Sequence, residues 1–62
     1  MNKLEAISAM MQGKKMTHCY FSYDEWVTIR GGHFVFEDGV QCSPALFWHD
    51  RTIPGWLNGW SE

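Results

Sequence analysis

Hydrophobic and polar residues alternate most regularly in the middle of the chain, on either side of the dipeptide Gly31-Gly32. The flanking segments "EWVTIR" and "HFVF" are predicted to be β-strands, because alternation with a period of two is typical of strands that bury one face. A two-residue glycine loop between them opposes Val27 with Phe36 and Ile29 with Phe34. Directly opposed residues share a face, so these four side chains should form one apolar face.

The opposite face of this hairpin is chemically mixed. It combines an indole, a guanidinium and an imidazole with smaller side chains, and we expect it to point away from the core. Its members are Trp26, Thr28, Arg30, His33, Val35 and Glu37.

A second turn at Asp38-Gly39 allows two registers. A two-residue loop would leave Val40 outside, whereas a three-residue loop over residues 37–39 turns Val40 and Cys42 toward the apolar face. The longer loop also places Gly39 at the left-handed position of a type I turn with a G1 bulge. Because it buries two further apolar groups, we expect this register and a three-stranded meander.

An amphipathic helix is predicted for residues 3–12. Asn2 is followed three residues later by Glu5, which is a variant of the capping box that starts helices, and Gly13 is a suitable C-terminal cap. Large apolar residues then recur at helical spacing, and we expect this stripe to pack into the core. The stripe consists of Leu4, Ile7 and Met11, with Met10 widening it.

The remaining segments complete a small domain. "KMTHCYF" is predicted to be a first strand and "SYDE" a loop. After Ser43, "PALFWHD" should form a short helical turn with Pro44 at its first position, and the tail "TIPGWLNGWSE" a loop with a short strand near Trp60. We therefore expect a single α+β domain over residues 1–62, with one N-terminal helix packed on a small antiparallel sheet.

Size and charge narrow the classes of partner. A chain of 62 residues buries only about 60% of its unfolded surface and is marginally stable alone, so we expect a homo-oligomer. The net charge of −2, with only five Lys and Arg residues, argues against duplex nucleic acid as a partner. No segment has the composition of a signal peptide or the length of a membrane span, which favours a cytoplasmic protein.

Catalytic and metal-binding motifs are not evident. The sequence contains no G-x-S-x-G, H-E-x-x-H or glycine-rich phosphate loop. Its three His and two Cys residues lack the paired spacing of zinc sites. We therefore expect a protein without cofactor or metal that acts by binding and is not an enzyme.

Two groups of residues are candidates for ligand binding. Aromatic rings that stack on a base contribute about 1–3 kcal/mol each, and arginine is a planar fork that stays charged opposite phosphate. The alternative interpretation is that these rings cover the core or meet another subunit. Trp, Tyr and Arg also dominate protein interfaces, so either group would suit a protein partner. The first group is Trp26, Arg30 and His33, and the second is Trp48, Arg51 and the neighbouring His49.

The N-terminal segment "LEAISAMMQGKKM" resembles a known protein family. A helix reading E-A-I-x-x-M-x-x-G-K-K that leads directly into a strand resembles the N-terminal signature of a family of small phage proteins, best known from the Thoeris anti-defence sponges. In this chain His18 stands where the family usually carries Arg, and Gly59 precedes the final Trp in place of Asp. The matching positions are Gly13, Lys14, Lys15, His18, Phe21 and Trp60.

The resemblance implies a phage protein in the host bacterial cytoplasm, which assembles as an oligomer and traps a cyclic ADP-ribose-like signal between its subunits. Sequestration of a nucleotide-derived signal is accordingly the first functional hypothesis. The alternative is a protein that inhibits a host enzyme or defence complex by direct contact. The sequence does not decide between a ring that stacks on a base and one that enters a partner's pocket.

Overall fold

The glycine-linked hairpin forms in the predicted register. In the computed structural model, which describes residues 1–62, β2 (Val27–Arg30) and β3 (His33–Phe36) pair antiparallel, with Val27 opposite Phe36 and Arg30 opposite His33. Gly31 and Gly32 have φ angles of 60° and 79°, the left-handed conformation that a two-residue turn requires and that side chains with a Cβ rarely adopt.

The second turn follows the predicted three-residue loop. The strand β4 (Gln41–Cys42) pairs with β3 so that Cys42 lies opposite Phe34, and the Phe36 N–H donates to the Val40 carbonyl at 2.9 Å. The prediction that Val40 joins the core is wrong, because its side chain is 56% exposed. Cys42 is half-buried and packs against the core, as predicted.

The N-terminal helix α1 (Lys3–Met11) begins with the predicted capping box. The Glu5 N–H donates to the Asn2 side chain at 2.8 Å, and the Asn2 N–H donates to the Glu5 carboxylate at 2.9 Å. The helix ends one residue earlier than predicted, with Gln12 as its C-cap.

The buried face of α1 differs from the predicted one. Ala6, Ala9 and Met10 are buried, whereas Leu4 and Met11 are 76% and 71% exposed. These buried residues are also spaced at i, i+3 and i+4, so the helix carries two apolar stripes. The stripe with two alanines faces the sheet because small side chains let the helix approach closely. The stripe of larger residues faces outward.

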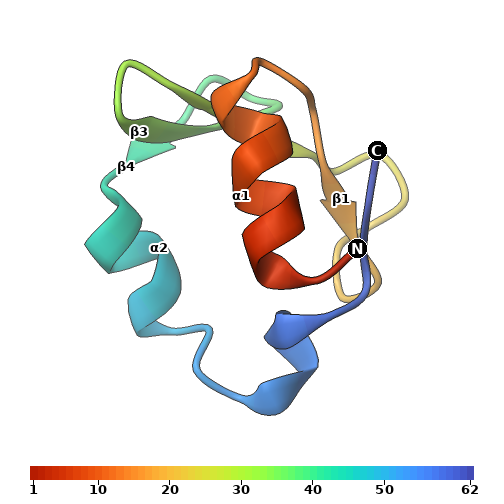
Figure 1. Ribbon diagram of the computed structural model, residues 1–62. Coiled ribbons are helices and arrows are strands. Elements are labelled where there is room, and N and C mark those ends of the chain that lie inside the picture. The colour runs from red at the N-terminus through yellow and green to blue at the C-terminus, as the bar shows by residue number, and fades with distance from the viewer.

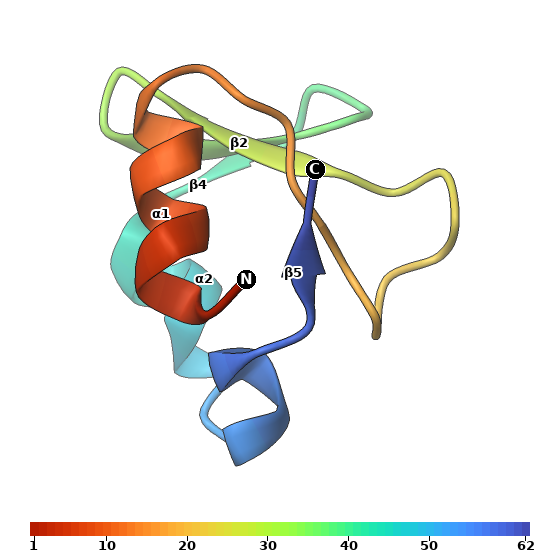
Figure 2. The same ribbon diagram turned by 45° about the vertical axis from the view of Figure 1, so that its right-hand side comes forward.

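Two short strands form a second, two-stranded sheet next to the meander. The strands β1 (Thr17–His18) and β5 (Trp60–Ser61) pair antiparallel, so the predicted strand near Trp60 is present and the first strand is shorter than its predicted segment. Backbone hydrogen bonds between Met16 and Val27, at 2.8 and 2.9 Å, link β1 to the meander. Figure 2 shows β5 alongside the β1 segment and close to the N-terminus.

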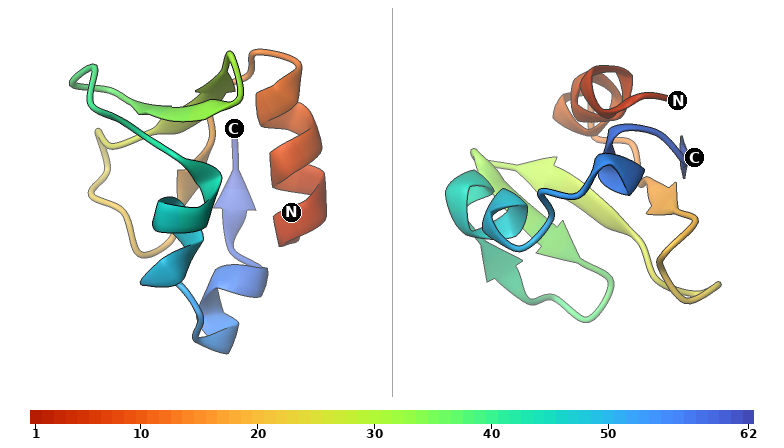
Figure 3. Two further views of the ribbon diagram at one scale, coloured as in Figure 1. Left: turned by 90° about the vertical axis from the view of Figure 1, so that its left-hand side faces the viewer. Right: turned by 90° about the horizontal axis from the view of Figure 1, so that it is seen from below.

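Two further helical segments complete the chain (Figure 1). Helix α2 (Pro44–His49) starts as predicted, with the Ser43 hydroxyl accepting from the Leu46 N–H at 3.3 Å. A 3-10 helix, η1 (Pro54–Leu57), lies in the tail that was predicted to be a loop. Both α-helices lie on the same side of the three-stranded sheet, as Figure 3 shows, and no helix is long and apolar enough to cross a membrane.

The core lies between this sheet, the two helices and β5. Phe34 of β3 stacks on Phe47 of α2 with ring centroids 4.0 Å apart and planes nearly parallel. Eight hydrophobic residues are buried: Ala6, Ala9, Met10, Met16, Val27, Phe34, Phe47 and Trp60. The predicted α+β architecture, one N-terminal helix on a small antiparallel sheet, is confirmed.

One residue of the predicted outer face is also buried. Thr28 is only 3% exposed, and its hydroxyl donates to the Lys14 carbonyl at 2.7 Å. The segment that joins α1 to β1 runs alongside β2 and covers this position. The outer face is therefore interrupted in its middle.

Candidate functional site

An apolar groove lies between the two helices and the hairpin. It has a volume of about 260 Å³. Side chains of α1, β2, β3 and α2 form its walls, and no charged residue lines it. The lining residues are Ile7, Met11, Ile29, Gly32, Phe34, Pro44 and Trp48.

The outward stripe of α1 forms one wall of this groove. Ile7 and Met11 are one helical turn apart and both line it, and Leu4 lies on the same helical face. Leu4 and Met11 are mostly exposed. A row of large apolar side chains beside an apolar groove is typical of a surface that contacts another molecule.

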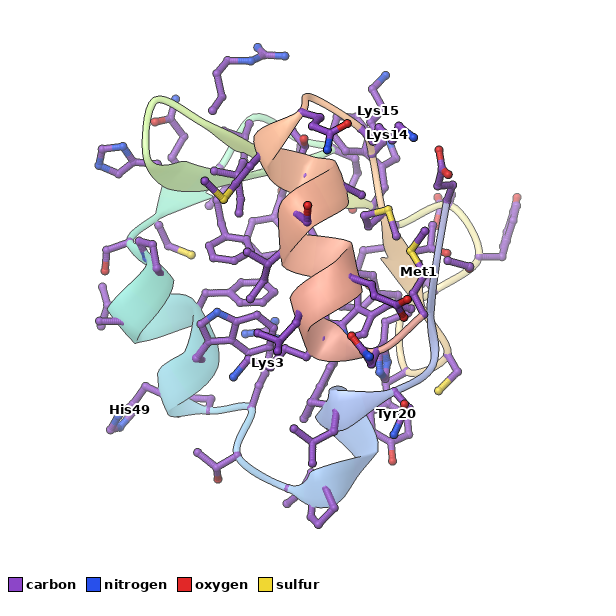
Figure 4. All side chains as sticks on the ribbon, viewed as in Figure 1. Met1, Lys3, Lys14, Lys15, Tyr20 and His49 are labelled. Atoms are coloured by element: carbon purple, nitrogen blue, oxygen red, sulfur yellow. The ribbon has the colours of Figure 1, made fainter.

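Lys3 marks one end of the groove. Its ammonium nitrogen lies 4.0 Å from the ring centroid of Trp48, which is the distance range of a cation–π contact. Figure 4 shows Lys3 at the start of α1, on the side that faces α2. Trp48, one of the predicted ligand-binding residues, is thus half-buried in the groove wall, with Lys3 over its ring.

The first predicted ligand-binding group is divided along the sheet. Arg30 and His33 are directly opposed beside the glycine turn, and both are exposed. Trp26 is four residues from Arg30 along an extended segment, a span of about 13 Å, and the Lys15 ammonium lies 4.5 Å from its ring centroid. The structure therefore brings Arg30 and His33 together and leaves Trp26 just before the opposite end of β2.

The second predicted group is also divided. Arg51 lies against the core, where its guanidinium is 4.1 Å from the ring centroid of Phe47 and 5.2 Å from that of Trp56. One guanidinium nitrogen, Nη1, donates to the Phe47 carbonyl at 2.9 Å, and the buried Nε has no partner. His49 is exposed on α2 (Figure 4). In this arrangement Arg51 links α2 to η1.

A buried histidine, which the sequence analysis did not single out as a structural residue, ties the tail to β1. His18 is 4% exposed, and its Nδ1 accepts the Tyr20 N–H at 3.0 Å. The ring proton must therefore be on Nε2, which lies 2.6 Å from the Asn58 carbonyl and 3.1 Å from the Gly55 carbonyl and donates to both. These partners are 37 and 40 residues away along the chain, so no local pattern could reveal them.

The thiol of Cys19, next to His18, has no neighbouring base that is free to take its proton. The Cys19 sulfur is 3.7 Å from Nδ1 of His18, but the lone pair of that nitrogen is already engaged with the Tyr20 N–H. Both cysteines are free thiols. No group of three His, Cys, Asp or Glu side chains is arranged to hold a metal ion.

A second depression lies at the N-terminal end of α1. It has a volume of about 400 Å³ and is open to solvent, with Lys3 lying between it and the groove. Its lining combines two leucines with one charged and two amide side chains, and consists of Asn2, Lys3, Leu4, Leu57 and Asn58. The groove differs from this depression in having no charged residue in its lining. The chain matches no protein-family model, no curated protein and no solved structure.

Proposed function

We propose that this protein is a non-catalytic binding protein that docks a partner protein in the apolar groove and acts by masking part of that partner. This is the contact-inhibitor hypothesis from the sequence, with a host enzyme or defence complex as the kind of target. The observation that carries it is the groove, with the exposed stripe of α1 as its wall.

The size of the groove favours a protein partner over a nucleotide. Sites for small molecules typically have about 300–1,000 Å³ and a few convergent polar groups. The groove has about 260 Å³ and no polar side chain in its lining, so it suits one or two apolar side chains of a larger partner. Met11 adds a flexible, polarizable wall of the kind that adapts to such anchors.

Binding without turnover also agrees with the histidine and cysteine geometry. A nucleophilic thiol needs an adjacent base that can take its proton. Nδ1 of His18 accepts a backbone N–H and Nε2 donates to two carbonyls. Neither nitrogen is free to act as that base in the folded chain.

Photocrosslinking tests the groove. A photoreactive amino acid is placed at Met11 in one variant and at Tyr23, which is 99% exposed in a loop, in a control variant. We expect a discrete crosslinked protein from position 11 that is absent from position 23, and that disappears when Ile7→Glu is added. The same crosslinks from both positions, or none from position 11, would contradict the proposal.

A second candidate is sequestration of a nucleotide-derived signal by a homo-oligomer. Its support is the outer face, where the exposed Arg30 and His33 are paired and Lys15 lies over Trp26. Native mass spectrometry of protein from cells that make the signal tests it. An oligomer that carries a nucleotide-sized mass, lost in Arg30→Ala but not in Met11→Ala, would favour this function over the first.

A further inference from the structure

Three hydrogen bonds hold the imidazole of His18 in its neutral form. Nδ1 accepts the Tyr20 N–H at 3.0 Å, and Nε2 donates to the carbonyls of Asn58 and Gly55. A neutral histidine has one acceptor and one donor nitrogen, whereas the charged ring has two donors. Because the folded chain uses the acceptor, only the neutral ring satisfies all three contacts.

A proton on Nδ1 would meet the backbone that follows β1. Nδ1 and the Tyr20 amide nitrogen are 3.0 Å apart, so the charged ring would place two N–H groups against each other. Turning the ring over puts carbon atoms at the positions of both nitrogens and also loses the contacts with the tail. The two carbonyls can still accept from a charged ring, so the conflict lies at Nδ1, and movement of the ring away from Tyr20 relieves it.

The immediate surroundings of His18 offer no counter-ion to a charged ring. The residue is 4% exposed, and a buried charge is costly unless it is paired. The titratable side chains that face it are the Cys19 thiol, 3.7 Å from Nδ1, and the phenol of Tyr20, whose ring centroid is 4.9 Å from that of the imidazole. Both are neutral near pH 7 at the values usual for these groups in peptides.

The charged groups on the segments packed against His18 do not supply an anion either. The Arg51 guanidinium lies 5.2 Å from the ring centroid of Trp56, and that ring contacts the imidazole. The Met1 ammonium donates to the backbone of β5 at 2.8 Å. The carboxylate that follows β5, that of Glu62, is 3.8 Å from the ammonium of Lys14. Positive charge on His18 would therefore be buried among neutral and cationic groups.

We propose that His18 is an acid-sensitive latch, which holds the C-terminal tail on β1 while its ring is neutral and releases the tail when the ring takes up a proton. The tail that the latch holds consists of residues 54–61, which form η1 and β5. Both carbonyls bound by Nε2 and the two indoles that contact the ring belong to this tail. The Cys19 N–H, which donates to the Gly59 carbonyl at 3.1 Å, is the adjoining backbone bond between β1 and the tail.

The direction of the pH dependence follows from where the proton binds. Histidine in an unfolded chain takes up a proton near about pH 6.5, and the closed latch has no place for that proton. Stability falls with decreasing pH wherever the unfolded state binds more protons than the folded state. One such residue raises the unfolding equilibrium constant by up to about 25-fold between pH 7 and pH 5. Carboxylates contribute little in this range, because they take up protons at about pH 4.

Opening of the latch reaches the apolar groove through one tryptophan. Trp48, in the groove wall, packs against Trp60 of β5 with ring centroids 5.9 Å apart. Release of the tail removes this contact, so we expect acid to alter the groove as well. The consequence for partner binding rests on the proposed function, whereas the latch itself does not.

The first test follows the wild-type chain, labelled with ¹⁵N, from pH 7.5 to pH 5. Ring nitrogen shifts distinguish the neutral from the charged form of each histidine, and the exposed His33 and His49 are internal controls. We expect the hydrogen-exchange protection of the Cys19 amide to fall by about tenfold relative to that of the Phe36 amide in the hairpin. A charged His18 with Cys19 still protected, or equal losses of protection at Cys19 and Phe36, would overturn the proposal.

His18→Gln provides a matched comparison, because its amide can donate to a tail carbonyl and takes up no proton. Whatever its stability at pH 7, its unfolding equilibrium constant in urea should change by less than about threefold between pH 7 and pH 5. His33→Gln should keep the wild-type pH dependence. The same pH dependence in the wild type and in His18→Gln would contradict the latch, and if His18→Gln does not fold, the wild-type titration decides.

The amides of Met11 and Gly32 distinguish the latch from its effect on the groove. Shifts that change together with the protection of Cys19 would support the coupling between tail and groove. Constant shifts while Cys19 loses protection would refute that coupling and leave the latch intact. A failed crosslink from position 11 would count against the proposed function alone, because none of these measurements uses a partner.

Discussion

His18 provides the sharpest test of how this small fold is held together. Its ring lies between two indoles, with centroid distances of 4.3 Å to Trp56 and 4.7 Å to Trp60. Its two nitrogens bond three backbone groups, one from Tyr20 just after β1 and two from the tail. His18→Ala removes the ring and leaves two carbonyls and one N–H to find water in a space that is closed to solvent in the native protein.

The cost of this substitution is estimated from the contacts. Each net hydrogen bond contributes about 0.5–1.5 kcal/mol, and the two strongest, those that the His18 nitrogens make with Asn58 and Tyr20, together give about 1–3 kcal/mol. Loss of a buried ring also leaves a cavity, and replacing a buried aromatic ring by alanine costs about 3 kcal/mol or more in total. A domain of this size has a total stability of about 3–9 kcal/mol. We therefore expect a Tm lowered by about 12–24 °C.

Thermal unfolding followed by circular dichroism measures the effect. The matched control is His33→Ala, because His33 is exposed and its ring makes a single hydrogen bond, with the Gly31 carbonyl of its own turn at 3.0 Å. It should change the free energy of unfolding by less than about 0.5 kcal/mol. His18→Phe keeps an aromatic ring without its hydrogen bonds and should fall between the two. Equal Tm values for His18→Ala and His33→Ala would refute the reasoning.

Two further substitutions probe the packing around this histidine and under the outer sheet face. Gly59→Ala combines a φ of +87° with a Cβ that would lie 2.7 Å from the sulfur of Cys19, whereas Gly39→Ala has a similar φ of +86° and open space around its Cβ. Urea denaturation should show that Gly59→Ala lowers the free energy of unfolding by at least about 1 kcal/mol more than Gly39→Ala does. Equal losses for the two variants would contradict the predicted clash with Cys19. Thr28→Val deletes the buried hydroxyl and leaves a backbone carbonyl unpaired, so we expect a loss of about 1–3 kcal/mol in the same assay, with exposed Thr52→Val as the unaffected control.

The hairpin could be predicted in detail because its determinants are local. Gly31-Gly32 selects a two-residue turn, and the alternation on both sides selects the same pairing independently. The same agreement, between the residues of the turn and the two-residue alternation of apolar side chains, also predicted the three-residue turn that ends at Gly39. The caps of both α-helices were predictable for the same reason, since each involves residues three positions apart.

The helix face was not predictable from side-chain size. The large residues Leu4 and Met11 suggested the core, but α1 packs with Ala6 and Ala9 toward the sheet. The deciding quantity is how closely two backbones can approach, and that depends on the partner surface as well as on the helix itself. The groove follows from the same choice, because the stripe that does not enter the core becomes its wall.

The candidate ligand-binding residues show a second limit. The sequence placed Trp26, Arg30 and His33 on one face, but a face of a strand extends over many ångströms, and only the two opposed residues meet. Arg51 was expected beside Trp48 on the surface, and it lies instead on the rings of Phe47 and Trp56. The contact between Arg51 and Trp56 depends on where the C-terminal tail packs against the core, and the spacing of residues along the chain does not predict that position.

The pairing of β1 with β5 has a consequence for biosynthesis. Thr17 and Ser61 are 44 residues apart in the chain, and the buried ring of Trp60 enters the core from the far end. The hairpin can form on the ribosome within microseconds of its emergence because its contacts are local, but the core cannot close until the last turn of the tail has been translated. We therefore expect nascent chains that stop before Trp60 to be substrates for chaperones and proteases.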